Sequence, residues 1–195
     1  MAGRTREDFA QVGLDLLAEA GIRGVTVSTV CDRLGVTTGS FYHHFRGVPD
    51  LRGAMLEHWE QKYARDRPAA VRDLPPLERL DALIEASIDR EHAIENALRD
   101  WSRTDPDAAA VQRRLDELRI AFTAETLEAC GVPAARARVL AVSGLAMLIG
   151  YQNLAEPIGH DETLAAADEW RSHLHRVIEE SSFAASRHPS REPVA

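Results

Sequence analysis

Residues 27–45 constrain the fold more than any other part of this chain. Within them the small residue Cys31 is followed four positions later by Gly35 and ten positions later by the apolar Phe41. A helix-turn-helix requires a small side chain where its two helices touch and a glycine that can take a positive φ angle in the turn. It also requires an apolar side chain that holds the second helix to the body of the protein. The spacing therefore predicts a helix-turn-helix in this segment.

The second helix of that motif is predicted to expose a polar face. Phe41 and Phe45 fall on its buried side. The other face carries hydroxyl and imidazole side chains, which donate hydrogen bonds to phosphate oxygens, as do backbone N–H groups at the start of a helix. Gly39 allows the backbone to approach a neighbouring surface closely. The segment is thus predicted to lie in the major groove of duplex DNA.

The run TVSTVCDRLGVTTGSFYHHFR, residues 26–46, resembles the DNA-binding signature of the TetR (tetracycline-repressor) family. The resemblance covers roughly residues 5–60, and its core, G-V-x-x-G-x-x-Y-x-H-F, is highly specific to that family. It implies a dimeric transcription regulator, most often a repressor, that reads a palindromic double-stranded DNA operator and releases it when a small-molecule effector binds. The residues it implies in DNA contacts are Ser28, Thr37, Thr38, Gly39, Ser40, Tyr42, His43, His44 and Arg46.

Two positions depart from the family pattern. The family usually places a lysine near the start of the fourth helix, where this sequence has Val48, and Arg46 is expected to supply the positive charge instead. Cys31 stands where alanine is usual, and it is small enough to preserve the packing. We expect a buried, inert thiol there, with redox sensing as the alternative.

The composition of the whole chain favours helices. Ala, Leu, Glu and Arg dominate, all of them good helix formers, and aromatic residues make up only 6%. We therefore expect an all-α protein with a three-helix DNA-binding domain at residues 1–47. A larger C-terminal helical bundle for ligand binding and dimerisation is expected at 48–184. Residues 185–195 have little to bury and are expected to form a disordered tail.

Capping residues and apolar stripes set the expected helix limits. The expected helices are 5–20, 26–34, 37–45, one that follows Pro49, 76–101, 105–131, 137–156 and 162–183. The polar stretch from Ala64 to Pro76 is expected to form a boundary between the helix after Pro49 and the rest.

Charge is distributed unevenly along the chain. The protein has a formal net charge of −8, whereas residues 1–52 hold six arginines and six acidic residues and are neutral. Non-specific affinity for DNA is therefore expected to be weak. Arg4 and Arg6 are expected to form a small basic arm, the alternative being charges that are merely solvated.

The protein is expected to be cytoplasmic and to have no membrane partner. No apolar run approaches the ~20 residues that span a bilayer. The N-terminus has no apolar stretch of the signal-peptide type. Cys31 and Cys130 lie far apart and suit free thiols in a reducing compartment.

Candidates for the effector site come from polar and aromatic residues near apolar stripes, because ligand pockets are mostly apolar with a few polar groups. They are His92, Asn96, Trp101, Phe122, Met147, Tyr151 and Gln152, although for each residue alone core packing or solvent exposure is the simpler explanation. The segment Val139–Leu154 is too apolar for a surface helix. With the apolar side of residues 162–183 it is expected to form a four-helix interface in a homodimer.

An enzymatic function has little support in the sequence. There is no nucleophile–base pair at informative spacing, no phosphate-binding loop and no cluster of metal ligands, and no cofactor is expected. The second hypothesis is a ligand-binding helical bundle whose N-terminal motif does not bind DNA. The neutral N-terminal part and the missing lysine favour it, and sequence-preferring binding to DNA would separate the two hypotheses.

Overall fold

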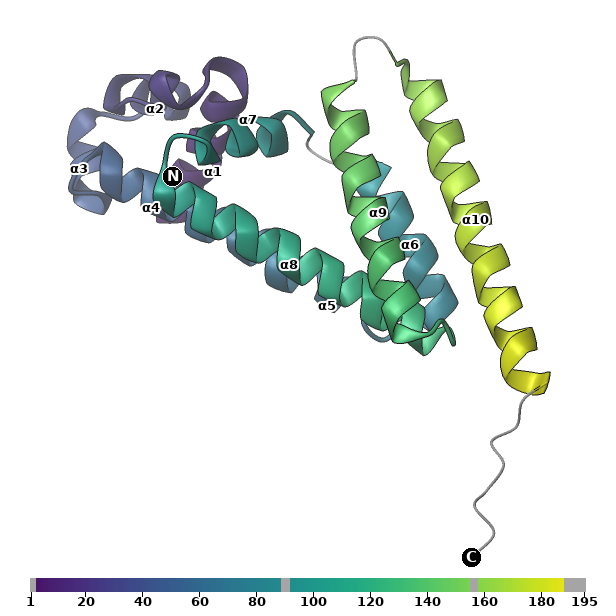
Figure 1. Ribbon diagram of the computed structural model, residues 1–195. Helices are drawn as coiled ribbons and strands as arrows, with labels where there is room; N and C mark the ends of the chain where they lie inside the picture. Colours follow the sequence, from purple (N-terminus) through teal and green to yellow (C-terminus); the bar gives the residue numbers. More distant parts are fainter. Residues whose placement is uncertain (1–2, 89–91, 155–157, 188–195) are drawn as a thin grey trace, which may run out of the picture. The chain divides into compact units, whose positions relative to one another are not determined.

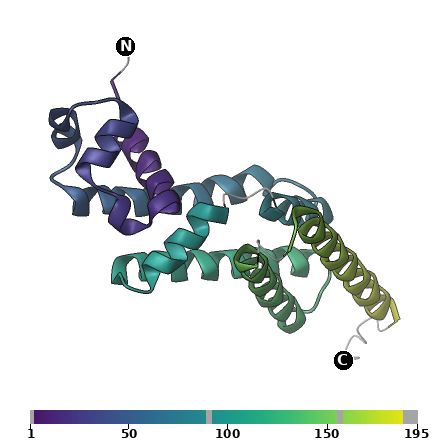
Figure 2. The same ribbon diagram turned by 90° about the horizontal axis from the view of Figure 1, so that it is seen from above.

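The computed structural model confirms the all-α class (Figures 1 and 2). It describes residues 3–88, 92–154 and 158–187, and within these ranges every regular element is helical. The helices are α1 (Arg6–Ala20), η1 (Ile22–Gly24), α2 (Val27–Leu34), α3 (Thr38–His44), α4 (Val48–Gln61), η2 (Lys62–Asp66), α5 (Arg67–Val71), α6 (Pro76–Ile88), α7 (His92–Ser102), α8 (Pro106–Ala129), α9 (Ala134–Asn153) and α10 (His160–Arg187).

The chain divides into two compact units. The first combines Met1–Pro68 with Glu91–Asp116 and contains the predicted helix-turn-helix, and the second combines Ala69–Arg90 with Glu117–Ala195. α8 contributes residues to both units. The predicted boundary at residue 47 separates a DNA-binding domain from a ligand-binding domain. The division into packed units does not test that assignment of functions, so the boundary stays a prediction.

The core of the first unit includes the contacts of α1 with α4 and α7. Phe9 and Leu17 of α1 are at most 1% exposed, as are Met55 and Trp59 of α4. α1 and α4 approach closely at Gly13, where an added Cβ atom would lie 2.7 Å from Sδ of Met55. The missing side chain thus lets the thioether of Met55 lie against the backbone of α1.

A charged network joins α7 to α8 inside the first unit. Arg99 donates two hydrogen bonds to the carboxylate of Asp116, at 2.9 and 2.8 Å, and a third to the fully buried Glu95 at 3.2 Å. Burial opposes the charge of the guanidinium, but the two carboxylates outweigh it and raise the pKa of Arg99. The network therefore fixes the register of α7 against α8.

The second unit is a bundle of α6, α9, α10 and the C-terminal half of α8. Leu80, Leu127 and Leu174 are among the residues buried in its core. α6 packs against α10, and there the Nε2 atom of His175 lies 2.9 Å from Oδ1 of Asp81. Each helix of the bundle contributes apolar side chains to one shared core.

The expected boundary from Ala64 to Pro76 contains the junction of the two units, between Pro68 and Ala69, but it is more helical than expected, because the chain is helical as far as Val71. Pro68 has no N–H group to donate to the preceding turn. Pro68 follows the π-helical turn η2, and the helical structure is interrupted at residues 72–75.

The stretch 76–101, expected as one helical segment, is described as α6 and α7, and residues 89–91 between them lie outside the described residues. Leu80 and Ile84 belong to the core of the second unit, whereas Leu98 and Trp101 belong to the core of the first. The apolar stripe thus serves two cores.

The C-terminal helix is longer than expected. α10 continues to Arg187, beyond the expected end at residue 183. Residues 188–195, most of the predicted tail, lie outside the described residues.

Gly13 supplies the first prediction. Changing Gly13 to Ala should lower the free energy of unfolding by about 1–2 kcal/mol, because the new methyl group overlaps a fully buried Met55 side chain. Gly53 of α4 is the matched control, since an added Cβ there meets nothing within 4 Å. Gly53→Ala should instead raise the free energy by about 0.5–1 kcal/mol through helix propensity. Equilibrium urea unfolding measures both, and equal effects would contradict the close approach.

Candidate nucleic-acid interface

The predicted helix-turn-helix is present as α2, a short turn and α3. Thr26 caps the start of α2 and accepts a hydrogen bond from the N–H of Thr29. Gly35 ends α2 with φ 65° and ψ 39°, the left-handed conformation that the turn was predicted to need. Thr37 then caps α3, and its hydroxyl accepts from the N–H of Ser40 at 3.3 Å.

An aromatic cluster holds α3 to the body of the first unit. Phe41 is fully buried and Phe45 is 2% exposed, as predicted. Their rings lie 6.0 and 5.6 Å from the ring of Phe9 on α1, and 5.3 Å from each other. The imidazole of His44 lies 5.2 Å from the same Phe9 ring. A helix of seven residues is unstable alone, so α3 depends on these contacts.

The residues predicted to contact DNA lie largely on the surface that this packing leaves free. Tyr42 is 60% exposed. Ser28, Thr37, Thr38, Gly39, His43 and Arg46 are exposed as well, while Ser40 and His44 are half-buried. α3 and its cap bring Thr37 to His44 together on one short element. Ser28 instead lies in the first turn of α2, where its hydroxyl donates to Asp32 at 3.3 Å, and Arg46 lies just beyond the end of α3.

Arg6 does not extend as the expected basic arm. Its guanidinium donates to the carbonyl oxygen of His44 at 2.7 Å and to Oδ1 of Asp50 at 2.6 Å. The carbon at its centre lies 4.4 Å from the centre of the Phe45 ring. Arg4 donates a longer hydrogen bond, 3.4 Å, to the carbonyl oxygen of Leu34. Both arginines thus donate to acceptors within the first unit, although their side chains are exposed.

The ion pair of Arg6 and Asp50 persists across the neutral pH range. The hydrogen bond from Arg6, with a second one from the N–H of Arg46, lowers the pKa of Asp50. A lowered folded-state pKa stabilises the fold fully above the unfolded-state pKa, and this contribution is lost as pH falls through the folded-state value. Asp50 therefore remains ionised at neutral and mildly acidic pH.

Another arginine of this region also forms an ion pair within the protein. Arg33 donates to both carboxylate oxygens of Glu19, at 2.9 and 2.6 Å. The pairing lowers the pKa of Glu19 and raises that of Arg33. The neutral balance of residues 1–52 is therefore built partly from pairs within the protein.

Cys31 is buried, as expected, at 3% exposure. Its thiol lies 3.6 Å from the carbonyl oxygen of Thr37, on the turn between the two helices. Burial raises the pKa of this thiol, and the neighbouring carboxylate of Asp32 adds to the effect. Because the thiolate is the reactive form, these surroundings support the predicted inert role.

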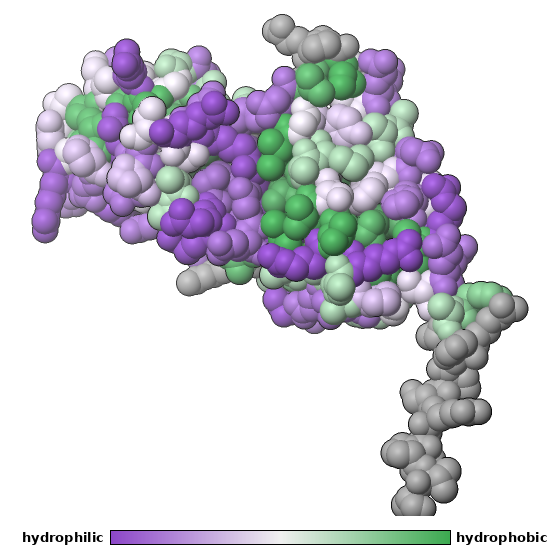
Figure 3. All heavy atoms as spheres, in the orientation of Figure 1, coloured by the Kyte–Doolittle hydropathy of each residue, from purple (hydrophilic) through white to green (hydrophobic). Residues whose placement is uncertain are grey.

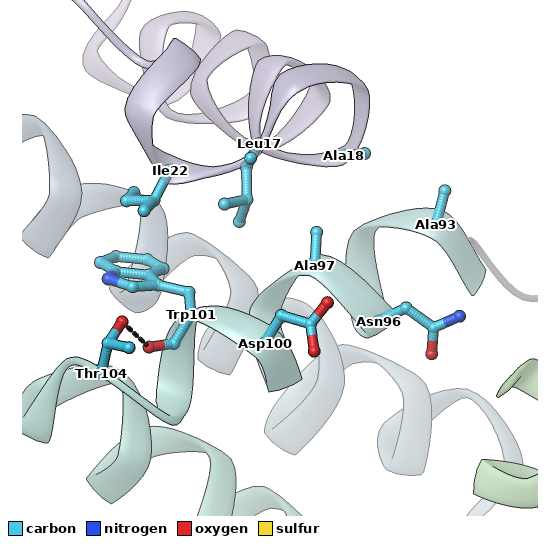
Figure 4. Close-up of a pocket in the computed structure, with 10 residues that line it drawn as sticks. Leu17, Ala18, Ile22, Ala93, Asn96, Ala97, Asp100, Trp101 and Thr104 are labelled. Carbon is cyan, nitrogen blue, oxygen red and sulfur yellow. Dashed lines mark hydrogen bonds between the residues drawn. The ribbon is translucent and has the colours of Figure 1, made fainter.

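Two of the effector candidates, Asn96 and Trp101, line a cavity of about 460 Å³ in the first unit (Figure 4). They come from α7, and the facing wall comes from Leu17 of α1 and Ile22 of η1. Asp100 adds a carboxylate at the same cavity. Sequence patterns did not identify the α1 wall, because its apolar residues have the spacing of ordinary core positions.

The other effector candidates do not line that cavity. Phe122, Met147, Tyr151 and Gln152 belong to the second unit, where Gln152 is 5% exposed and the other three are half-buried. The side chain of His92 lies outside the described residues. Within the described ranges, no group of three or more His, Cys, Asp or Glu side chains is placed to hold a metal ion.

The fold and the exposed face of α3 define this chain as an all-α helix-turn-helix protein. A family model described as bacterial regulatory proteins, tetR family, matches residues 10–55. The HTH-type transcriptional regulator BetI of Burkholderia cenocepacia (strain HI2424) is 31% identical over 159 residues, which are 74% of this chain and 77% of that protein. The chain belongs to the TetR family of bacterial regulatory proteins.

Two further comparisons support the assignment. The HTH-type transcriptional repressor KstR2 of Mycobacterium tuberculosis (strain ATCC 25618 / H37Rv) is 33% identical over 92 residues, 45% of this chain. The match spans 46% of that relative, about half its length. The crystal structure of a transcriptional regulator from Rhodococcus sp. Rha1 has a TM-score of 0.70 at 22% identity, covering 89% of this chain and 97% of that one, and shows the same fold.

Proposed function

We propose that the protein is a cytoplasmic DNA-binding transcription regulator, acting as a repressor that leaves a palindromic operator when a small molecule binds. The observation that carries the proposal is α3, which buries Phe41 and Phe45 and exposes hydroxyl and imidazole groups on its other face. Such groups suit phosphate oxygens and base edges. Family membership favours this function over a ligand-binding bundle that does not bind DNA.

The names of the relatives agree with the proposal. The mycobacterial relative is named a repressor and the Burkholderia relative a regulator of transcription. Both names describe control of gene expression rather than catalysis, so we propose no enzymatic activity and no cofactor.

Substitutions on α3 test the DNA-binding function. Tyr42→Phe should weaken binding to all duplexes alike, by about threefold to tenfold, because it removes one hydrogen bond to the DNA backbone. Thr38→Val should instead change the ranking of operator variants, since its hydroxyl is proposed to meet base edges. Mobility shift with the DNA that flanks the gene measures both effects.

Thermal unfolding provides the control for these variants, because exposed side chains at both positions leave the core unchanged. The proposal fails if the wild-type protein shows no sequence preference. The assigned roles fail if Tyr42→Phe leaves affinity unchanged.

We also propose that the regulator is a homodimer joined through α9 and α10. Contrary to the expectation from the sequence, α9 is long and apolar enough to cross a membrane by length and composition alone, and only 11% of its most apolar stretch is buried inside the protein. Val139 is 64% exposed and Val142 is 44% exposed. Apolar side chains gather over the face of this helix in Figure 3. An exposed apolar patch of this kind marks a surface that a partner covers.

A second copy of the chain suits that surface better than lipid does. Val139, Val142 and Ala146 are exposed at spacings of three and four residues, which places them on one side of α9. Ala146 and nearby Gly150 are small and allow a second helix to approach closely. The acidic and basic residues of α10, which runs alongside, suit water rather than a bilayer. Two-fold symmetry would pair identical patches in an isologous contact.

Val142→Glu should convert the dimer to a monomer, because it places a charge in an apolar interface without a partner. Leu118→Glu on α8 is the matched control, since Leu118 is 48% exposed and Val142 is 44% exposed. Sedimentation equilibrium should find a dimer for the wild type and the control. A dimeric Val142→Glu protein would contradict this interface. A wild-type monomer that floats with lipid vesicles would identify a membrane as the partner instead.

We propose the cavity between α1 and α7 as the effector site. Its volume of about 460 Å³ lies in the range of small-molecule pockets, and its lining combines apolar side chains with the polar groups of Asn96, Asp100 and Thr104. The apolar surface comes from Leu17, Ile22 and Trp101 (Figure 4). A ligand there would touch α1, the helix against which α3 is anchored.

Filling the cavity tests this site. Ala97 lines it and is half-buried, so Ala97→Phe should occupy the space. Compounds from a metabolite panel that raise the melting temperature of the wild type should no longer do so for this variant. Ala109→Phe on α8, at a half-buried position outside the cavity lining, should retain the shift. A retained shift in Ala97→Phe would place the effector elsewhere.

A further inference from the structure

Three elements of the first unit meet at one side chain. Arg6 is the first residue of α1, His44 is the last residue of α3, and Asp50 lies in the first turn of α4. The guanidinium of Arg6 bonds the carbonyl of His44 at 2.7 Å and the carboxylate of Asp50 at 2.6 Å, and lies over the ring of Phe45. We name these four residues the Arg6 clamp.

The clamp acts where α3 is weakest. The last carbonyl groups of any helix have no partner within that helix, and a cation at this end is favourable. Arg6 supplies both the donor and the charge for the carbonyl of His44. α3 has only seven residues, so its last turn is a large part of the whole helix.

Asp50 extends the same support to the chain that follows α3. One carboxylate oxygen accepts from Arg6 and the other accepts from the N–H of Arg46 at 3.0 Å. A single side chain thereby holds both the arginine and the backbone at the exit from α3. Tyr42, His43 and His44 belong to the turn that this arrangement fixes.

We propose that Arg6 and Asp50 are positioning residues for DNA binding, which hold the C-terminal turn of α3 in the orientation that contacts the duplex. The inference rests on the proposed DNA-binding function. Arg6 then acts through α3 and makes no contact with DNA itself. This differs from the basic arm expected from the sequence, in which Arg6 would meet a phosphate.

The two roles predict opposite effects for Asp50. In a positioning role, Arg6→Gln and Asp50→Asn both break the clamp, and both should weaken DNA binding by roughly fivefold, the upper end for one exposed charge pair. If Arg6 met a phosphate instead, Asp50→Asn would strengthen binding, because it frees the arginine and removes a negative charge near the DNA. The sign of the Asp50→Asn effect therefore decides between the roles.

The salt dependence of binding gives an independent readout. Each phosphate neutralised by a cation changes the slope of log K against log salt by about 0.9. A positioning role leaves that slope unchanged in Arg6→Gln, whereas a phosphate contact would reduce its magnitude by about 0.9. Mobility shift with the duplex that flanks the gene, repeated over a series of salt concentrations, measures both affinity and slope.

A matched ion pair in the same unit provides the control. Arg114 and Glu60 meet through two hydrogen bonds, at 2.8 and 2.9 Å, with side chains 51% and 30% exposed, against 45% and 32% for Arg6 and Asp50. Their pair joins α8 to α4 rather than to α3. Arg114→Gln and Glu60→Gln should leave DNA affinity unchanged, although they remove the same charges.

Hydrogen exchange separates positioning from a general loss of stability. The amides of residues 42–46 should exchange faster in Arg6→Gln and Asp50→Asn, while the melting temperature stays close to that of the wild type. Arg6→Lys keeps the charge but replaces the planar guanidinium with a single ammonium group, and it should restore part of the affinity. Tighter or unchanged binding by Asp50→Asn would overturn the clamp alone. A wild-type protein that binds no DNA would overturn the proposed function and the clamp with it.

Discussion

The aromatic contact between α1 and α3 is the constraint on which the rest of the site depends. A seven-residue helix has too few internal hydrogen bonds to offset the cost of ordering its backbone. The rings of Phe41 and Phe45 supply what the helix lacks, because both are buried against Phe9. Their burial also decides which side chains are left outside. The exposed face of α3 is thus a consequence of packing, and a substitution in the residues beneath α3 would alter that face without changing any of its side chains.

Charge has a different role in this protein from the one that a basic DNA-binding surface would suggest. Arg6 and Arg33 are paired with carboxylates of the same unit, so part of the positive charge near α3 is used internally. Few cations then remain to displace counterions from DNA, and the non-specific component of binding should be small. In the proposed function, neutral donors such as Tyr42 make a correspondingly larger contribution to binding. A weak non-specific component raises the ratio of specific to non-specific affinity, which is the quantity that matters on a genome.

Local sequence signals made the helix-turn-helix predictable. Contacts between residues that are distant in sequence could not be predicted in this way. The helix predicted over 26–34 and the positive φ of Gly35 depend on a few neighbouring residues, and the structure confirms both. The pair of Arg6 and Asp50 joins residues 44 positions apart, and no periodicity connects them. The division of the apolar residues of 76–101 between two cores was missed for a related reason, since their spacing does not say which core each residue joins. The cavity was not predicted from the sequence, because the residues of its α1 wall have the pattern of ordinary core residues.

α1 links the two sites proposed for the first unit. Its first residue, Arg6, bonds the end of α3, and Leu17 near its other end lines the cavity. A helix of 15 residues spans about 22 Å at roughly 1.5 Å per residue, and a packed helix moves as a body. A ligand shifts DNA affinity only if it binds the DNA-competent arrangement and the released arrangement with different affinity. A ligand wedged between α1 and α7 meets that condition if release involves a displacement of α1, because the clamp would carry that displacement directly to the last turn of α3.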